Sequence, residues 1–224
     1  MIIPALAVGR TQELVYALNQ LDTNGDIPEL PVFVDSPLAV NATDVFRMHP
    51  EVWRPELRDF LNDGGRQAPF DYSNLEYVRV SAAASNLIFW PNRQSLSVPA
   101  AWRKVGRILH HLKNNIADKA NTILLVSFQA QHTLGRRLQD GDKKVRIFGD
   151  EYQVRAEVDT IEGYSAHADQ AGLLAWATAF DRNRLQKFFL VHGEPEPMQV
   201  LATKLQATDV SQVAMPVRGQ KYEF

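Results

Sequence analysis

Residues 2–36 read IIPALAVGRTQELVYALNQLDTNGDIPELPVFVDS, and this stretch decides the fold class. The apolar run over 2–8 predicts a buried strand that ends at Gly9. Thr11 is placed to N-cap a helix that reaches to about Leu21, because apolar residues recur there at helical spacing. Residues 32–34 predict a second buried strand. A strand–helix–strand unit of this kind is typical of a parallel α/β sheet.

The remaining sequence continues this alternation. We expect helices over 40–48, 106–116, 132–140, 169–180 and 195–206, and strands over 122–128, 187–192 and about 213–217. Residues 145–159 alternate like a pair of strands around Gly149-Asp150. Residues 81–105 show neither helical nor strand periodicity, and two prolines interrupt any long element, so this segment does not fit the alternation. A structureless loop of about 25 residues would be uncommon inside a compact domain.

The composition is that of an ordinary soluble globular protein, with 45% hydrophobic and 22% charged residues. The sequence contains no cysteine, which excludes disulfides, a thiolate metal site and a cysteine nucleophile. Any metal must therefore be held by His, Asp or Glu. No apolar stretch is long enough to suggest a membrane span, and no basic region follows Met1, so we expect a cytoplasmic protein without a signal peptide.

The formal net charge of −2 does not indicate a nucleic-acid binder, although local basic clusters can still bind phosphates. Two clusters qualify: Arg103, Lys104 and Arg107, and Arg136, Arg137, Lys143 and Lys144. A solvated charged face is the alternative interpretation of both.

Two histidines lie in turns where catalytic groups of α/β proteins gather. His167 precedes an amphipathic helix in a turn of small residues, and His192 ends an apolar strand and is followed by Gly193. Such a position allows an imidazole to act as a metal ligand or as an acid or base. A hydrogen-bonded structural histidine is the alternative for each. His110 and His111 are neighbours on a helix and point in different directions, so they are poorly placed to bind one metal together.

The ends of the first two strands carry a second set of candidates. Gly9, Arg10, Thr11, Asp35 and Ser36 could meet a phosphate through backbone N–H groups and the arginine side chain. A helix cap and an Asp-Ser-Pro turn explain the same residues equally well.

Six segments together resemble the metallo-β-lactamase/β-CASP family of bacterial RNA-processing nucleases. They are IPALAVGRTQEL at 3–14, VFVDSPLA at 32–39, GRILHHL at 106–112, GRRL at 135–138, YSAHAD at 164–169 and LVHGE at 190–194. The last two resemble the family's motifs B and C. The segments span nearly the whole chain in the family's order.

The resemblance implies a fold. Residues 1–160 would form a β-CASP domain, a parallel sheet flanked by helices, and residues 161–224 the C-terminal part of a metallo-β-lactamase αββα domain. The family's N-terminal half, with its H-x-H-x-D-H zinc ligands and an acidic motif A residue, does not appear in this sequence. We therefore expect an N-terminally truncated chain whose partner is that missing half.

The resemblance also implies an activity: a zinc-dependent ribonuclease in which two zinc ions activate water against an RNA phosphodiester. His192 would be a zinc ligand, and His167 would be a catalytic residue at the scissile phosphate. RNA would be the substrate, and a homodimer is possible. With one retained ligand this chain alone should be inactive, since catalytic zinc needs about three protein ligands. A non-catalytic RNA-binding or regulatory subunit and a non-functional gene product are the alternatives.

Residues 81–105 depart from the family, which has an apolar strand and a Ser-Gly-Met turn at this point. The codons permitted for residues 92–105 can also be read in a shifted frame that starts at the third base of the Asn92 codon. In that frame they can encode Pro-Ala-Ile-Ile-Ile-Ser-Ala-Ser-Gly-Met-Ala-Glu-Gly. For example, GCA-TGG-CGG-AAG-GT for 101–105 gives Met-Ala-Glu-Gly when it is entered at the last A of the first codon. We therefore hypothesise a compensated frameshift across roughly 82–105.

This hypothesis predicts the DNA sequence. Resequencing codons 82–105 should yield codons that encode the Ile-Ile-Ile and Ser-Gly-Met pattern in the shifted frame. Sequencing the DNA upstream of Met1 as well should find an open frame that encodes H-x-H-x-D-H, as the ribonuclease hypothesis expects. Codons that cannot give the shifted reading would disprove the frameshift.

Overall fold

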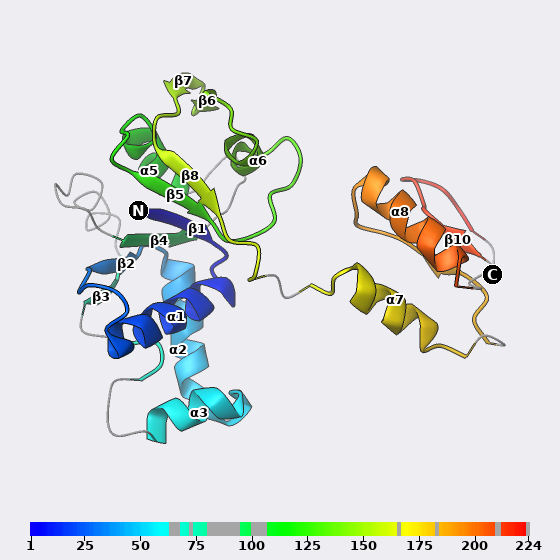
Figure 1. The fold of residues 1–224 in the computed structure, drawn as a ribbon, viewed down its shortest axis with the longest axis horizontal. Coiled ribbons are helices and arrows are strands. Elements are labelled where there is room, and N and C mark those ends of the chain that lie inside the picture. Colours follow the sequence, from blue (N-terminus) through cyan, green and yellow to red (C-terminus); the bar gives the residue numbers. More distant parts are fainter. Residues whose placement is uncertain are drawn as a thin grey trace. The chain divides into compact units, whose positions relative to one another are not determined.

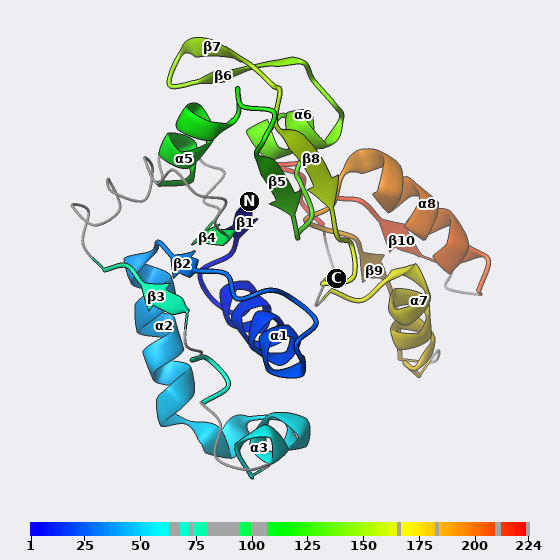
Figure 2. The same ribbon diagram turned by 60° about the vertical axis from the view of Figure 1, so that its left-hand side comes forward.

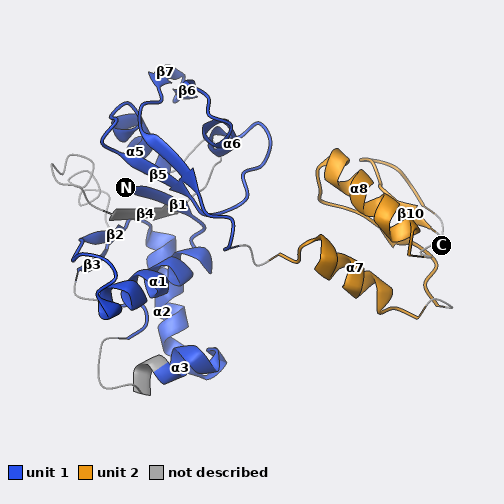
Figure 3. Cartoon of the chain, in the orientation of Figure 1, with its two compact units in different colours: residues 1–164 blue, residues 165–224 orange. Residues whose placement is uncertain are grey.

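The computed structural model describes residues 1–62, 68–71, 74–79, 95–99, 107–164, 167–181, 184–208 and 212–222. The chain forms two compact units, Met1–Tyr164 and Ser165–Phe224 (Figure 3). The family resemblance implies a domain boundary between residues 160 and 161, which stays a prediction.

Unit 1 is built on a six-stranded sheet in the order β3-β2-β4-β1-β5-β8 (Figure 1). Every neighbouring pair is parallel. The strands are β1 (Ile2–Ala5), β2 (Val32–Val34), β3 (Leu75–Tyr77), β4 (Ser95–Pro99), β5 (Thr122–Leu125) and β8 (Glu157–Thr160). The parallel α/β sheet expected from the sequence is confirmed.

Helices cover both faces of this sheet, as Figures 1 and 2 show: α1 (Arg10–Asn24) and α2 (Pro37–Met48) on one face, α5 (Arg107–Asn115) and α6 (Leu134–Gln139) on the other. Alternate residues along the strands pack into hydrophobic cores on the two opposite faces of the sheet. Ile2, Phe33 and Ile123 pack with Ile108, Leu112 and Leu138 of α5 and α6. Ile3 and Val34 belong to the clusters that contain Leu14 and Val15 of α1. Burial on both faces explains why these strands are continuously apolar.

Strand β4 lies within residues 81–105, where the sequence shows neither helical nor strand periodicity. Residues 95–99 pair with β1 on one side and β2 on the other. The physical reason is backbone hydrogen bonding: the space between two strands is filled by any segment that satisfies both ladders, whatever its side chains. The rest of the proposed frameshift region lies outside the described residues, and the frameshift remains a hypothesis.

The N-termini of α1 and α2 differ from expectation. Helix α1 begins at Arg10 after Gly9, and Thr11 lies inside it, buried, with its hydroxyl donating to the Leu6 carbonyl oxygen at 2.7 Å. The prediction that Thr11 caps this helix is therefore wrong. Helix α2 begins at Pro37, and the Ser36 hydroxyl caps it by accepting from the Ala39 N–H at 3.1 Å. Beyond α2 the chain continues through η1 (Pro50–Val52) and α3 (Pro55–Asn62).

The expected strand pair near residue 149 is an antiparallel hairpin of β6 (Lys144–Ile147) and β7 (Asp150–Gln153). Its turn consists of Phe148 and Gly149, with φ of 54° and 95°. Two positive φ values define the tight turn that suits twisted strands. The last residues of the predicted pair instead form β8 in the main sheet.

Unit 2 contains α7 (Gln170–Thr178), β9 (Phe188–Phe189), α8 (Pro195–Gln206) and β10 (Val213–Ala214). The two short strands pair in parallel. Ala177 and Leu205 form the centre of a small core between the helices and strands. This confirms the helix–strand–helix–strand order expected from the sequence.

Among the helices that the structure describes, none combines the length and apolar character needed to cross a membrane.

Gly25 provides a test of the helix geometry. It ends α1 with a φ of 75°, and its N–H donates to the Asp22 carbonyl oxygen. Gly25→Ala should lower the free energy of unfolding by about 1 kcal/mol, because a side chain is strained in the left-handed region. The thermal midpoint should fall by about 2–4 °C in a chain of this size.

Gly163→Ala is the matched control. Gly163 does not have a left-handed φ, and a Cβ added there would meet no atom within 4 Å. Equal midpoint losses for the two variants would contradict the assignment of strain to Gly25.

Candidate active site at the strand ends

The carboxyl edge of the unit 1 sheet is the first candidate site. Strands β2 and β3 lie on one side of β1, and β5 and β8 lie on the other. Ligands of open α/β sheets bind at the carboxyl edge where the strand order reverses. The loops that follow β1, β2 and β5 all end there, and they contain the sequence-predicted residues Gly9, Arg10, Thr11, Asp35 and Ser36.

Asp35 follows β2 and is fully buried in an ionic network. Its Oδ1 accepts from Arg107 Nη1, and its Oδ2 lies 2.8 Å from Nε2 of His111. Asp35 lies on the same face of the sheet as Phe33, which is the face covered by α5. Arg107 and His111 stand four residues apart on α5, so one turn of this helix presents both to the carboxylate.

This network leaves one polar atom without a partner. His111 is 1% exposed, and no described group lies within hydrogen-bonding distance of its Nδ1. A proton on Nε2 allows this nitrogen to donate to the Asp35 carboxylate. Asp35 thus serves as an anchor between β2 and α5.

Arg10 is also engaged within the chain. Its guanidinium pairs with Glu13 and lies 5.1 Å from the centre of the Tyr164 ring. Its side chain is only 10% exposed, and its Nε has no partner among the described residues. Of the five predicted phosphate contacts, Thr11, Asp35 and Ser36 have side chains bound within the protein, and only Ser36 acts as a helix cap. Gly9 remains a phosphate candidate, whereas the Arg10 side chain is held by Glu13 and Tyr164.

Apolar side chains are exposed along this same edge. Leu6 and Val8 follow β1, and Phe128, which is 72% exposed, follows β5. Tyr164 follows β8 and packs against the core cluster of Ile3 and Leu14. We refer to Leu6, Val8, Phe128 and Tyr164 as the apolar edge. Tyr164 is half-buried, whereas the exposed ring of Phe128 can stack on a nucleic-acid base.

The second basic cluster is largely neutralised by local ion pairs. Arg136 pairs with Asp140, Arg137 with Asp142, and Lys144 with Glu151. These pairs favour the interpretation of a solvated charged face. In the first cluster Arg107 binds Asp35, while Arg103 and Lys104 lie outside the described residues.

His192 is held in an unusual turn in unit 2. Its φ is 64°, a left-handed conformation that few residues other than glycine adopt. A Cβ on the next residue, Gly193, would lie 2.7 Å from Cγ of Met198. His192 is exposed, and structured backbone lies on both sides of it. Strand β9 precedes it, and α8, which has Pro195 at its first position, follows it.

His167 lies just before α7 and is exposed. Asp169 caps this helix, since its Oδ1 accepts from the Gly172 N–H at 2.7 Å. The carboxylate of Asp169 therefore fixes the start of α7, two residues after His167. Residues 165 and 166 of this turn lie outside the described part of the chain.

The described residues do not by themselves fit a metal ion. Among them, no group of three or more His, Asp or Glu side chains converges on one point. His192 is one exposed imidazole, whereas catalytic zinc needs about three protein ligands.

Sequence analysis missed Arg107 and His111 as partners of Asp35. His111 was judged only against its neighbour His110, which points elsewhere. The available signal was the four-residue spacing of Arg107 and His111, which places a cation and an imidazole on one helix face.

Comparisons with known proteins match both units. Residues 11–138 match the Beta-Casp domain, and residues 151–216 match the Zn-dependent metallo-hydrolase RNA specificity domain. The second match begins in β7 of unit 1 and contains both His167 and His192.

Three relatives illustrate the similarity. Ribonuclease TTHA0252 of Thermus thermophilus is 33% identical over 221 residues, which is 98% of this chain and 49% of the relative. Transcription termination factor FttA of Methanosarcina mazei is 29% identical over 209 residues, 91% of this chain and 32% of the relative. An RNase J-like protein of Methanocaldococcus jannaschii is 28% identical over 221 residues, 98% of this chain and 49% of the relative. The chain thus spans between a third and a half of the length of these relatives.

Asp35 yields a stability prediction. Asp35→Ala should lower the free energy of unfolding by about 3–5 kcal/mol, because it leaves the cation of Arg107 and the buried imidazole of His111 without their partner. Urea denaturation followed by circular dichroism measures this change.

Asp159→Ala is the matched control, since Asp159 is an exposed aspartate in β8 of the same sheet. Its free energy of unfolding should change by no more than about 0.5 kcal/mol. A loss below about 1 kcal/mol for Asp35→Ala would show that the network does not anchor β2 to α5.

Proposed function

The chain belongs to the Beta-Casp family, and from this premise we propose that it is the RNA-holding part of a zinc-dependent ribonuclease. The observation that carries the proposal is the match to an RNA specificity domain across the His167 and His192 turns. The relatives named as a ribonuclease and an RNase J-like protein support the same reaction.

In this proposal RNA lies along the carboxyl edge of the unit 1 sheet. Phe128 of the apolar edge offers a face on which a base can stack, and the backbone at Gly9 lies beside a passing phosphate. Asp35 does not contact RNA. It holds β2 and α5 in the arrangement that forms the edge.

The two histidines have different proposed roles. His192 is one ligand of the zinc site, held in position by the Gly193 turn. His167 donates a proton to the oxygen that leaves the scissile phosphate. The other zinc ligands come from outside this sequence, so that the chain alone binds RNA but does not cleave it.

A non-catalytic RNA-binding or regulatory subunit is the second candidate. It is supported by the relatives whose name is transcription termination factor rather than ribonuclease. The two proposals differ in whether cleavage appears when the missing zinc-binding half is supplied as a separate polypeptide.

The RNA contact is testable on the chain as it stands. Fluorescence anisotropy with a labelled single-stranded RNA should show binding that weakens as salt rises from about 50 to 200 mM, because phosphate contacts release counterions. The RNA should remain uncleaved with or without added Zn²⁺. Phe128→Ala should weaken binding by about fivefold or more, since a stacked base contributes roughly 1–3 kcal/mol.

Phe148→Ala is the control, because Phe148 is also an exposed phenylalanine of unit 1 but lies in the β6–β7 turn. Equal weakening by both substitutions would reject the apolar edge as the RNA site. Absence of RNA binding would reject the proposed function. Cleavage of RNA by the chain alone would reject the proposal that the other zinc ligands come from outside this sequence.

A further inference from the structure

The loop that joins β5 to α6 in Figure 1 contains a histidine with a left-handed backbone. The N–H of Thr133 donates to the Ala130 carbonyl oxygen at 3.3 Å, which closes a turn with Gln131 and His132 at its centre. Of these two residues only His132 has a positive φ, of 64°, as the third residue of a type II turn does. Glycine or asparagine is the usual residue there, because a larger side chain is strained. His132 is therefore present at a cost in stability.

The rest of this loop is held by its own hydrogen bonds. The Thr133 hydroxyl caps α6 and donates to the Ala130 carbonyl oxygen at 2.7 Å. The side chain of Gln129 is buried and donates to the Ser127 carbonyl oxygen at 2.7 Å. The imidazole of His132, in contrast, is exposed and forms no hydrogen bond or ion pair with a described residue. No polar contact of this imidazole within the described part of the chain offsets the strain.

The turn lies at the carboxyl edge of the unit 1 sheet, in the same loop as Phe128. Strand β5, which the loop follows, is next to β1, where the strand order reverses. Residues 119–139 contain no aspartate or glutamate, so no acidic side chain of this segment repels a phosphate. An imidazole has an N–H donor in either neutral tautomer, and phosphate oxygens accept from such donors. His132 therefore combines an unused donor with a position beside an exposed aromatic ring.

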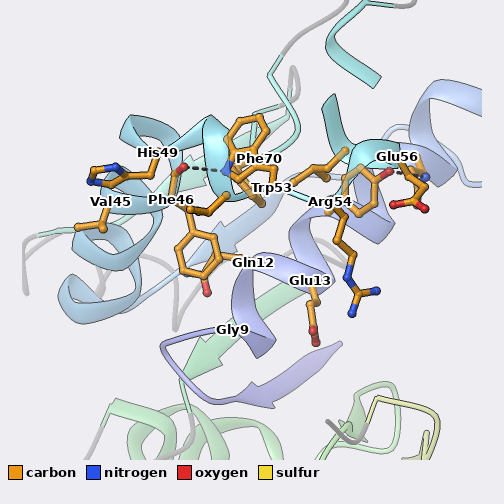
Figure 4. A pocket seen from close by; sticks show the side chains of 14 residues that line it. Gly9, Gln12, Glu13, Val45, Phe46, His49, Trp53, Arg54, Glu56 and Phe70 are labelled. Carbon is orange, nitrogen blue, oxygen red and sulfur yellow. Dashed lines mark hydrogen bonds between the residues drawn. The ribbon is translucent and has the colours of Figure 1, made fainter. Parts of the chain in front are cut away.

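His49 is also an exposed histidine of unit 1, but its surroundings are different. It lines a cavity of about 730 Å³ between α1 and the segment that runs from α2 to α3 (Figure 4). Its Nδ1 lies 2.8 Å from Oε1 of Glu51. This carboxylate occupies one ring nitrogen and adds a negative charge beside the ring, which disfavours the approach of a phosphate. His49 thus provides a matched histidine without the features of a phosphate contact.

We infer that His132 is an RNA contact: its imidazole donates an N–H to a backbone phosphate of the strand whose base stacks on Phe128. The inference rests on the proposed RNA-binding function and names one residue that carries it out. The hydrogen-bonded turn holds the backbone of His132 in place before RNA arrives, so less conformational entropy is lost on binding. A phosphate contact positions the RNA without reading its sequence.

Fluorescence anisotropy of the whole chain with labelled oligoadenylate and oligouridylate tests the inference. His132→Gly should weaken binding of both RNAs by about threefold or more, because one hydrogen bond to a phosphate is lost. The thermal midpoint of this variant should stay the same or rise, since glycine is the residue that the turn favours. His49→Gly is the matched control and should leave the affinity for both RNAs unchanged.

Equal affinity of His132→Gly and the unsubstituted chain would overturn the inference, as would an equal loss of affinity in His49→Gly. A loss confined to one of the two RNAs would contradict it as well, because it would indicate a base contact in place of a phosphate contact. A loss accompanied by a lower thermal midpoint would assign His132 a structural role and reject the RNA contact. If the unsubstituted chain binds neither RNA, the proposed function fails too; if it binds both and His132→Gly has no effect, the inference alone fails.

Discussion

The buried carboxylate of Asp35 is the interaction on which the arrangement of unit 1 depends. Strands β1 and β2 are not neighbours, since β4 lies between them. Helix α5, which follows β4 in the chain, covers the face of the sheet opposite to α1 and α2 (Figure 1). Arg107 and His111 tie that helix to the end of β2 through one aspartate. Hydrophobic packing of Ile108 and Leu112 is non-directional, so it holds α5 on the sheet without fixing its position along the strands. A hydrogen-bonded ionic contact has a defined geometry and supplies that position.

Much of this architecture follows from the sequence, because its strands are buried on both faces and therefore appear as continuous apolar runs. Residues 2–5, 32–34 and 122–125 are of this kind, and the prediction of each strand is confirmed. Periodicity could not predict strand β4, since Ser95–Pro99 has no such run and its place is determined by the two ladders on either side. The family resemblance alone indicated a strand in this region. The N-terminus of α1 was placed wrongly for a related reason: Thr11 has the right side chain for a cap, but its hydroxyl binds the Leu6 carbonyl inside the fold. Local propensity and tertiary hydrogen bonding competed at both places, and tertiary hydrogen bonding prevailed.

The candidate site residues were selected from their positions in the fold, and this choice can misjudge individual side chains. The ends of parallel strands collect functional residues, so Asp35, His167 and His192 could be selected from their positions alone. Whether a selected side chain faces a ligand or the interior depends on contacts that are distant in sequence. Asp35 is an example, because its partners lie 72 and 76 residues further along the chain. His192 is the contrasting case, because its side chain is exposed and its backbone is left-handed. This conformation is strained, and the next residue, Gly193, lies close to Met198.

The insertion of β4 between β1 and β2 also has a consequence for folding during synthesis. Both sheet partners of β1 lie far along the chain, at residues 96–99 and 123, so the apolar segment Ile2–Ala5 must wait for them. At roughly 5–20 residues per second, the ribosome needs on the order of ten seconds to make them. During that interval two strand edges and their apolar side chains are open to other chains. A nascent polypeptide of this topology therefore has a long period of exposure to aggregation, and it depends on chaperones or on slow, non-local pairing to pass through it.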